Sequence, residues 1–376
     1  MKWAIINPWE ISEKSIGGTE RYVKDLANSL TSLGCEVDVY MLSGTNYSNN
    51  NVNYYSLNIS GEGVIVDEYE LASKFGDLTL ESTYNNIAKF LEDKIAVEKY
   101  DVLQLNSHIF LKCWGNKNRV YTLHSNKAEF LVTGTKKEYK LLEKIMKEQA
   151  QKGMKFVVPS QSYYEHWQNI LKQNVISIPH AIEPARLNCT VDTQEILNKY
   201  SLSNNKIKFL LPSRLEPIQK RPMLFLQACA KVKNNLKNKI QIVFTGIDSQ
   251  YEKYTYALKT LAKKKNIDAQ FVKFENINQG YKACEVVVMP SKMETFGYSA
   301  LEGLILGKPT ILSSIPTFYE ISQDNKQAYI FKTKKELTKI IEHLLTANLS
   351  VVLPSKQWVD RFDLLLWAKK YLEIKF

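Results

Sequence analysis

Short apolar runs and amphipathic stretches alternate along this 376-residue chain. Residues 3–7 form an apolar run, residues 19–33 carry apolar side chains at helical spacing, and residues 36–42 alternate between apolar and polar. The same alternation of runs and helical stretches continues through apolar runs at 101–106, 120–124, 156–160, 175–180, 206–215, 239–246, 270–274, 285–289 and 309–313. Strands that alternate with helices predict parallel sheets covered by helices, and a chain of this length predicts two domains.

Four further segments complete the predicted elements. The apolar spacing predicts helices over residues 71–96 and 136–152 and an amphipathic helix over residues 355–376. Residues 44–62 are rich in Asn and Ser, which predicts loops and turns.

Residues 285–313 form a strand–loop–helix–strand pattern around two glutamates. Glu294 lies in the loop after the strand, and Glu302 lies eight residues later, about two turns into the helix. Open α/β sheets bind ligands at the carboxyl ends of their strands, and the amides after Thr295 begin a helix that would attract an anion. The alternative is that both glutamates only favour the helix dipole.

The string Glu-Thr-Phe-Gly-x4-Glu-Gly-x3-Gly-x-Pro, which starts at Glu294, resembles the Glu-x7-Glu signature of the retaining family 4 glycosyltransferases. The resemblance covers almost the whole chain and is weaker over residues 44–100. It implies an α/β GT-B fold, in which two Rossmann-like domains face each other across a cleft and a C-terminal helix crosses back. The implied acceptor-side domain is 1–185 with the crossing helix 355–376, and the implied nucleotide-sugar domain is 186–354.

In the second domain, the resemblance assigns a donor site to matching residues. The segment after the strand at 206–215 looks like the family's Gly-Arg-Leu-x3-Lys-Gly, so Arg214 and Lys220 match its diphosphate-binding cations. An arginine fork and a lysine point charge suit two adjacent phosphates. Ser213 and Arg221 stand where the family has glycines, which predicts a stiffer loop. By the same resemblance, the donor contacts also include Glu294, Thr295, Phe296, Gly297 and Glu302.

In the first domain, the resemblance points to a glycine pair and a histidine. Gly17 and Gly18 match a Gly-Gly pair near the donor phosphate or acceptor, although two glycines can also simply permit a tight turn. His124 ends a predicted strand, as in the family, where this histidine lies under the donor sugar. His108 is better explained as a structural residue. The chain has Pro179-His180-Ala181 where the family has Pro-Asn-Gly, which leaves that turn and its ligand contact open.

Composition narrows the class of protein further. Hydrophobic residues make up 44% of the chain, as in ordinary globular proteins, and no apolar run reaches the length of a transmembrane helix. Residues 1–8 are predicted to form a strand rather than a signal peptide, so we expect a cytoplasmic protein. The five cysteines are scattered without a Cys-x-x-Cys pair, which favours buried thiols over zinc or disulfides.

The net charge of +11 is spread unevenly. Residues 1–111 hold 8 Lys and Arg against 16 Asp and Glu, whereas residues 112–155 hold 11 against 4 and residues 206–282 hold 16 against 5. Such asymmetry favours an anionic partner, such as a nucleotide, a membrane face, an anionic polymer or a nucleic acid. Solvated lysine faces would give the same pattern.

The resemblance therefore implies transfer of a sugar from a nucleotide-diphosphate donor, UDP favoured, to an acceptor hydroxyl with retention. His124, Glu294, Arg214 and Lys220 are the expected catalytic residues. No Asp-x-Asp occurs, so no obligatory metal or other cofactor is expected. The acceptor stays open between a glycan, a lipid-linked acceptor at the inner membrane face, and DNA, and so does the oligomeric state. The alternatives are a transferase for hydroxylated DNA bases and a non-catalytic nucleotide-sugar binding module.

Overall fold

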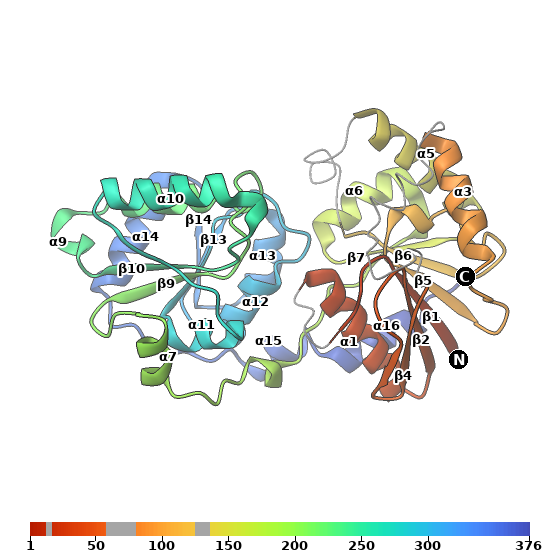
Figure 1. Ribbon diagram of the computed structural model, residues 1–376, viewed down its shortest axis with the longest axis horizontal. Helices are drawn as coiled ribbons and strands as arrows, with labels where there is room; N and C mark the ends of the chain where they lie inside the picture. Colours follow the sequence, from red (N-terminus) through yellow and green to blue (C-terminus); the bar gives the residue numbers. More distant parts are fainter. Residues whose placement is uncertain (13–16, 58–79, 125–135) are drawn as a thin grey trace. The chain divides into compact units, whose positions relative to one another are not determined.

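The computed structural model describes residues 1–12, 17–57, 80–124 and 136–376. The described chain forms two compact units, Met1–Ile182 with Phe362–Phe376, and Glu183–Arg361 (Figure 1). The sequence predicts the divisions at residues 185 and 354. The structure places them after Ile182 and after Arg361.

The first unit is built on a sheet that, within the described residues, has the strand order β3-β4-β2-β1-β5-β6-β7-β8. All described neighbours in it pair in parallel except β3 and β4. The strands are β1 (Lys2–Asn7), β2 (Glu36–Met41), β3 (Tyr47–Asn49), β4 (Val52–Ser56), β5 (Val102–Leu105), β6 (Arg119–Thr122), β7 (Lys155–Val158) and β8 (Val175–Ser177).

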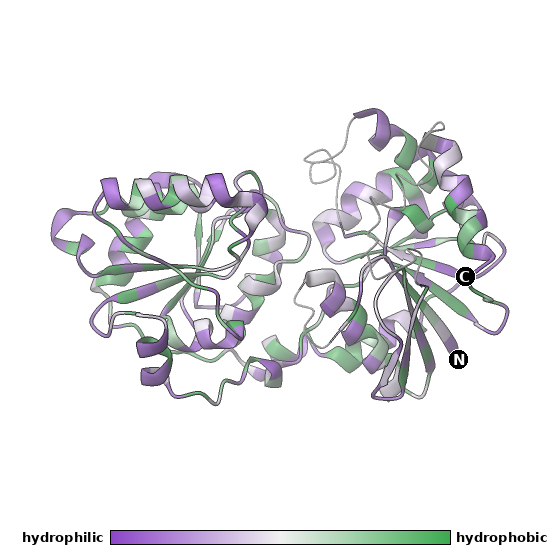
Figure 2. Cartoon of the chain, viewed as in Figure 1, coloured by the Kyte–Doolittle hydropathy of each residue, from purple (hydrophilic) through white to green (hydrophobic). Residues whose placement is uncertain are grey.

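Helices cover both faces of this sheet because its strands are apolar on both sides (Figures 1 and 2). Trp3 and Ile5 of β1 pack in a core with α1 and α16, whereas Ala4 and Ile6 face a second core with α3, α5 and α6. The described helices are α1 (Gly18–Ser32), α3 (Leu80–Glu92), α5 (Lys136–Gln151), α6 (Gln161–Leu171) and α16 (Leu364–Leu372), with short 3-10 turns η1 (His108–Phe110) and η2 (Lys172–Asn174). Of the helix predicted over 71–96, residues 71–79 lie outside the described residues.

The prediction of loops and turns over residues 44–62 is wrong for residues 47–49 and 52–56, which form strands, and residues 58–62 lie outside the described part. Strands β3 and β4 form an antiparallel hairpin there. Asn50 and Asn51 make its turn with φ values of 52° and 61°. A tight hairpin turn needs positive φ at both central residues, which asparagine tolerates well. The asparagines that indicated loop are therefore the turn of a hairpin, whose Val52 and Tyr54 are buried.

The single helix predicted over residues 355–376 is also wrong. Helix α15 (Lys356–Asp360) belongs to the second unit, and α16 belongs to the first. The break falls where the Asp363 side chain accepts a hydrogen bond from the Leu366 N–H at 2.8 Å and so starts a new helix.

The second unit has a parallel sheet of described strand order β11-β10-β9-β12-β13-β14. Its strands are β9 (Ile207–Leu211), β10 (Ile240–Phe244), β11 (Asp268–Phe271), β12 (Val286–Met289), β13 (Thr310–Ser313) and β14 (Ala328–Phe331). Its helices are α7 (Thr193–Lys199), α8 (Pro222–Cys229), α9 (Asn234–Lys237), α10 (Glu252–Lys264), α11 (Ile277–Ala283), α12 (Tyr298–Ile305), α13 (Pro316–Ser322), α14 (Lys334–Thr346) and α15, with 3-10 turns η3 (Pro184–Leu187) and η4 (Ser249–Tyr251).

Each sheet has a point where the strand order reverses. In the first unit the reversal lies between β1 and β5, and in the second it lies between β9 and β12. Ligands of open α/β sheets bind outside the carboxyl ends of the strands at such a point. The loops that follow β9 and β12 are therefore the natural place to examine for a site.

Candidate functional site

The loop after β9 is shaped by the buried carboxylate of Glu216. Its oxygens accept hydrogen bonds from the backbone N–H groups of Ile218 at 2.8 Å, Gln219 and Lys220 at 3.1 Å. Three donors on one carboxylate hold successive amides of the loop in a fixed curve. Lys220 is therefore presented from an ordered turn.

Arg221 ties this loop to the segment after β12. Its Nε donates to the Pro290 carbonyl at 2.8 Å and its Nη2 to the Ser291 carbonyl at 3.0 Å. Its backbone has a φ of 51°, in the left-handed region that favours glycine. The expectation of a stiffer loop gains a physical basis here, because the residue in place of the family's glycine clamps two segments together. Burial of the guanidinium lowers the pKa of Arg221.

Lys220 and Glu294 meet at the switch point of the second sheet. The Lys220 ammonium donates to Glu294 Oε1 at 2.7 Å, and the Ser291 hydroxyl donates to the same oxygen at 2.7 Å. Both charged side chains are largely shielded, with 14% and 9% of the side chain exposed. The described contacts engage Oε1 only, which leaves Oε2 as an acceptor for a ligand hydroxyl.

Helix α12 starts beside this pair, and its N-cap residue Gly297 makes no side-chain capping hydrogen bond. The N-cap residue Gly297 has a φ of 87°, and a Cβ on it would lie 2.7 Å from the Phe318 ring. Glycine is thus required for the chain to turn into the helix at this point. The Thr317 hydroxyl donates to the Glu294 carbonyl at 2.8 Å and fixes the loop from the other side. The buried Phe296 ring packs edge-on against Tyr298, with centroids 5.1 Å apart.

Glu302 lies in the same helix and is 5% exposed. The buried Tyr281 hydroxyl donates to Glu302 Oε2, so one carboxylate oxygen has a fixed direction. Gly303 lets the helix approach the sheet, since a Cβ there would come within 3.0 Å of Val287 and 2.8 Å of the Thr310 hydroxyl. Glu302 is therefore rigidly placed.

Arg214 is exposed just after β9, and the described residues give its guanidinium no hydrogen bond or ion pair. Its backbone lies against Gly246, where a Cβ would come within 2.7 Å of the Arg214 Cα. Gly246 has a φ of 59°, so both its space and its conformation require glycine. The end of β10 thus sets the position from which Arg214 extends.

In the first unit, Gly17 and Gly18 form the start of α1. Gly17 is its N-cap, with an ordinary φ of −69°. A Cβ at Gly17 would come within 2.0 Å of a Glu20 carboxylate oxygen, so the glycine makes room for that side chain. An acidic group in the first turn suits the helix dipole.

His124 follows the carboxyl end of β6 and packs in an aromatic cluster. Its ring centroid lies 5.0 Å from Tyr22 and 5.8 Å from His180. The Tyr22 hydroxyl shares hydrogen bonds with Thr122 at 2.7 Å and with Tyr371 of α16 at 2.9 Å. Burial lowers the pKa of His124 to about 4 and, together with His124, lowers the pKa of His180 well below its usual value. Both rings are thus neutral at pH 7.

His108 lies in η1, with its ring centroid 6.0 Å from the buried Tyr84.

The charged residues of the candidate site could be named from the sequence, but the residues that hold them could not. These supporting residues are Glu216, Tyr281, Ser291 and Thr317. Ser291 lies three residues before Glu294 in the same loop, so nearness in sequence was its signal. No helix begins at Ser291, so the pair is not a capping box. No local signal marks Tyr281, because it meets Glu302 only through the tertiary fold.

Solved structures with a similar fold show which class of protein this fold belongs to. Over 99% of this chain, the structure resembles sucrose-phosphate synthase from Thermosynechococcus elongatus, with a TM-score of 0.78, 16% identity and 97% of that chain covered. A glycosyltransferase from Rickettsia africae has a TM-score of 0.73 at 18% identity over 99% of this chain and 97% of its own. Anabaena HepE, in complex with UDP and glucose, has a TM-score of 0.72 at 15% identity over 99% and 98%. The fold is the GT-B fold of glycosyltransferases, as predicted.

Two family models then give the particular family. "Glycosyltransferase Family 4" matches residues 16–186, and "Glycosyl transferases group 1" matches residues 192–355. An uncharacterised glycosyltransferase of Methanocaldococcus jannaschii is 25% identical over 85% of this chain and 82% of its own length. The chain belongs to the group 1, family 4 glycosyltransferases and is a transferase.

Two features are absent from the described residues. No helix in them is long and apolar enough to span a bilayer. They also contain no group of three His, Cys, Asp or Glu side chains placed to hold a metal ion.

Proposed function

We propose that this glycosyltransferase moves a sugar from a nucleotide-diphosphate donor, UDP in preference, to an acceptor hydroxyl with retention and without a metal ion. The observation that carries the proposal is the arrangement after β9 and β12, where Lys220 pairs with the Glu294 carboxylate beside the start of α12. Arg214 lies exposed in the same loop as Lys220. This is a positive region with one oriented acceptor, which suits a diphosphate joined to a sugar.

The reaction breaks the bond between the sugar's anomeric carbon and the diphosphate oxygen. A bond from the same carbon to the acceptor oxygen forms on the same face, and the acceptor's proton leaves with the diphosphate. Negative charge grows on the departing oxygen, so fixed cations and amides lower the barrier by several kcal/mol. Arg214, Lys220 and the first amides of α12 take this role, in place of the metal ion that other transferases use.

The two glutamates bind hydroxyl groups in this proposal. Glu302, oriented by Tyr281, accepts from the ribose, and Glu294 accepts from the sugar through Oε2. His124 of the first unit contributes to catalysis as a neutral ring, because burial keeps its pKa near 4. Gly17 and Gly18 allow a ligand close approach to the start of α1.

UDP is preferred as the donor nucleotide because of two structural relatives. HepE is described in complex with UDP and with UDP-glucose, and an Escherichia coli trehalose-6-phosphate protein with UDP-2-fluoro glucose. Both have TM-scores above 0.7 to this chain.

Release of free nucleoside diphosphate from UDP-, GDP- and ADP-sugars tests the donor and the catalytic residues together. We expect turnover with the UDP-sugar, and a fall of about tenfold to a thousandfold in kcat for Lys220→Ala or Arg214→Ala with a smaller change in KM. Lys253→Ala, an exposed lysine of α10, is the matched control. Full turnover in both site variants would refute this site.

Two further measurements test the remaining parts of the proposal. Activity should persist in EDTA, and complete loss that Mg²⁺ restores would refute the metal-free reaction. The product anomer, read by NMR, should match the donor anomer. An inverted product would refute retention and leave the donor site intact.

A further inference from the structure

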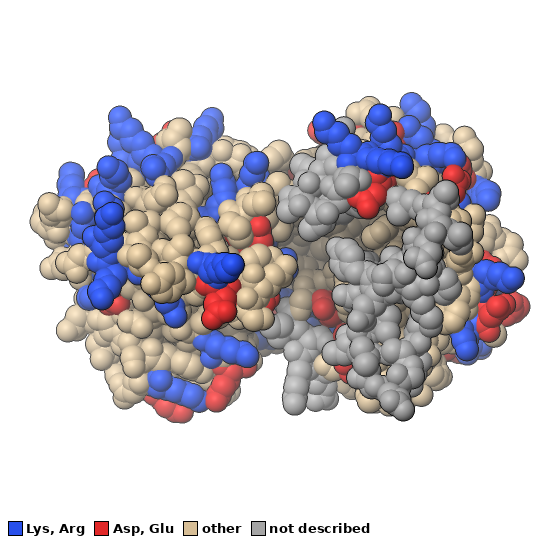
Figure 3. Space-filling view, turned by 45° about the horizontal axis from the view of Figure 1, so that its top comes forward, with Lys and Arg blue, Asp and Glu red and all other residues tan. Residues whose placement is uncertain are grey.

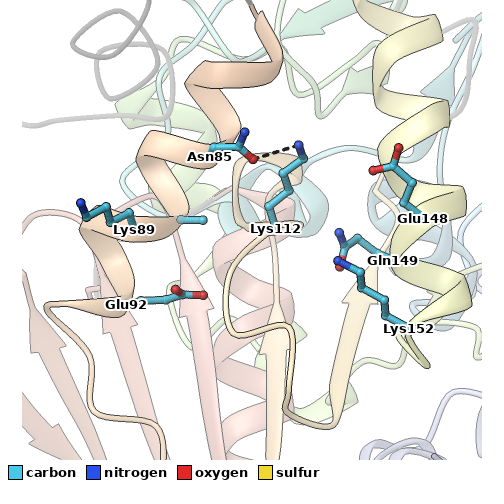
Figure 4. A pocket seen from close by; sticks show the side chains of 8 residues that line it. Asn85, Lys89, Glu92, Lys112, Glu148, Gln149 and Lys152 are labelled. Carbon is cyan, nitrogen blue, oxygen red and sulfur yellow. Dashed lines mark hydrogen bonds between the residues drawn. The ribbon is translucent and has the colours of Figure 1, made fainter.

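A polar pocket of about 270 Å³ lies in the first unit, between α3, α5 and the segment after η1 (Figure 4). Its polar lining residues come from three separate parts of the chain: Asn85, Lys89, Glu92, Lys112, Glu148, Gln149 and Lys152. The volume is below the ~300–1,000 Å³ of sites for drug-sized ligands, so it suits a small molecule.

The lining is dominated by hydrogen-bond donors. Lys112 donates to Asn85 Oδ1 at 2.9 Å, which leaves the Asn85 amide nitrogen as a donor (Figure 4). The described residues give the ammonium groups of Lys89 and Lys152 no hydrogen bond and no ion pair with a carboxylate. Of the two acidic groups, Glu92 accepts from the Trp114 N–H and Glu148 faces Lys144 at 3.8 Å.

A buried cation stands directly behind the pocket wall. The Arg119 side chain is fully buried, and its Nη1 donates to Gln149 Oε1 at 3.0 Å and to two backbone carbonyls. Because its oxygen is taken, Gln149 keeps an amide nitrogen as a further donor. In the described structure, Arg119 Nε and Nη2 have no hydrogen-bond partner. Burial without a bonded carboxylate lowers the pKa of Arg119 to about 10.

The pocket lies at the opposite edge of the sheet from His124. Its residues come from the end of α3, which leads to β5, from the segment before β6, and from the end of α5, which leads to β7. Arg119 begins β6 and His124 follows its end, which separates them by roughly 16 Å along the strand direction. The pocket is therefore distinct from the carboxyl edge of the sheet.

We propose that this pocket binds the phosphate group of a small phosphate monoester, held by the ammonium groups of Lys89, Lys112 and Lys152 and by the amides of Asn85 and Gln149. Lys112 also pairs with Glu81 at 3.6 Å, so the cations to which the described residues give no ion pair are Lys89, Lys152 and Arg119. A dianion compensates their charge. The three lysines come from different parts of the chain that line one pocket, and Figure 4 shows the Lys89 ammonium turned away from the other two. The flexible lysine stem lets this ammonium turn towards phosphate oxygens.

Binding of inorganic phosphate and of glucose 6-phosphate to the whole chain, measured by calorimetry and by thermal stabilisation, tests the site. We expect Lys89→Gln with Lys152→Gln to weaken binding at least tenfold. The matched control is Lys263→Gln with Lys264→Gln, which removes the same charge from exposed positions of α10 outside the pocket and should bind like the parent chain. Equal loss in both pairs, or no binding to the parent chain, would overturn the proposal.

The donor site could bind the same probes, so Arg214→Ala with Lys220→Ala is examined in parallel. Phosphate binding that persists in the variant with Arg214→Ala and Lys220→Ala supports the pocket. Phosphate binding that is lost in this variant but kept in the variant with Lys89→Gln and Lys152→Gln overturns the pocket. Vesicles of phosphatidylcholine with and without phosphatidic acid distinguish the source of the phosphate. Vesicle binding that the Lys89 and Lys152 changes abolish assigns a lipid headgroup to the site, whereas binding of the soluble probes alone assigns a soluble monoester.

Discussion

Glu302 owes its position to a tyrosine that is distant in sequence. The Tyr281 hydroxyl occupies one carboxylate oxygen, and Gly303 allows the helix to press against β12 and β13. A carboxylate fixed in this way binds a ligand hydroxyl without losing rotamer freedom, which improves affinity. The supporting residue should therefore matter for binding as well as the glutamate.

Replacing Glu302 with alanine should weaken nucleotide-sugar binding by about 10- to 100-fold. A charged acceptor for a hydroxyl is worth about 1.5–3 kcal/mol. Tyr281→Phe should produce a smaller loss in the same direction, because Glu302 stays but is no longer held. Calorimetry measures both, with Glu252→Ala on the exposed side of α10 as the control. Unchanged binding in Glu302→Ala would remove this residue from the site.

Arg221 offers a test of strain against hydrogen bonding. Arg221→Ala loses two hydrogen bonds and keeps the left-handed backbone, so we expect the free energy of unfolding to fall by about 2–3 kcal/mol. Arg221→Gly loses the same bonds but relieves about 1 kcal/mol of strain. Urea unfolding should rank the parent chain above glycine and glycine above alanine. If Arg221→Ala has the same free energy of unfolding as Arg221→Gly, the left-handed backbone at this position is not strained.

Helix α16 completes the first unit at the scale of elements. It packs along α1, and its Tyr371 bonds the same Tyr22 that touches His124 and His180 (Figure 1). The two histidines lie in this cluster beside Tyr22, Trp367 and Tyr371, with no carboxylate among these contacts. The cluster therefore favours neutral histidine rings.

The stability of the first unit should depend on pH through these two histidines. Their pKa values are lowered in the folded chain, so the unfolded chain binds more protons below pH 6.5. The stabilisation is complete above pH 6.5 and declines as the pH falls towards 4. At pH 5 the loss that His124 contributes should be about 2 kcal/mol, and His180 contributes in the same direction. Urea unfolding at pH 7 and pH 5 measures the loss, and His124→Gln with His180→Gln should reduce it. An identical pH dependence in that double variant would contradict this assignment.

Element positions could largely be predicted from apolar spacing, because the buried strands and amphipathic helices impose it. The hairpin of β3 and β4 could not, since Asn50 and Asn51 indicate a turn whether or not strands flank it. The break at Asp363 was hidden because apolar residues continue on both sides of it. The resemblance of the sequence to family motifs identified four candidate site residues, Arg214, Lys220, Glu294 and Glu302. Tyr281 required the fold, because its partner Glu302 lies in another helix. The partners of Glu216 are amides two to four residues further along the same loop, and no side-chain motif marks them.

Charge is the feature that concerns the whole molecule. Lysines gather on the first unit around α5 (Figure 3), where Lys144 pairs with Glu81 at 3.3 Å. Exposed charges of this kind attract an anionic acceptor over a range that salt limits to about 8 Å at physiological ionic strength.

Reversing Lys136, Lys137, Lys140 and Lys144 to glutamate should raise the KM for an anionic acceptor at low salt, because steering is lost. Nucleotide-sugar binding and donor hydrolysis without acceptor should stay nearly unchanged. The matched control reverses four lysines of the second unit, Lys253, Lys263, Lys264 and Lys265. Wild-type acceptor kinetics in the α5 variant would show that its lysines are only solvated.

Because α16 closes the first unit and comes last in the sequence, the first unit can be completed only at the end of synthesis. Tyr22 and Tyr371 are separated by 349 residues, so their hydrogen bond cannot form until translation is almost complete. At 5–20 residues per second, the ribosome needs roughly 20–70 s between these two tyrosines. The second unit, Glu183–Arg361, is continuous, but Arg361 precedes Tyr371 by only ten residues, so this unit is also complete only near the end of synthesis. The first unit therefore lacks its last helix, and the core that Trp3 and Ile5 share with α16 stays incomplete, until the end of synthesis.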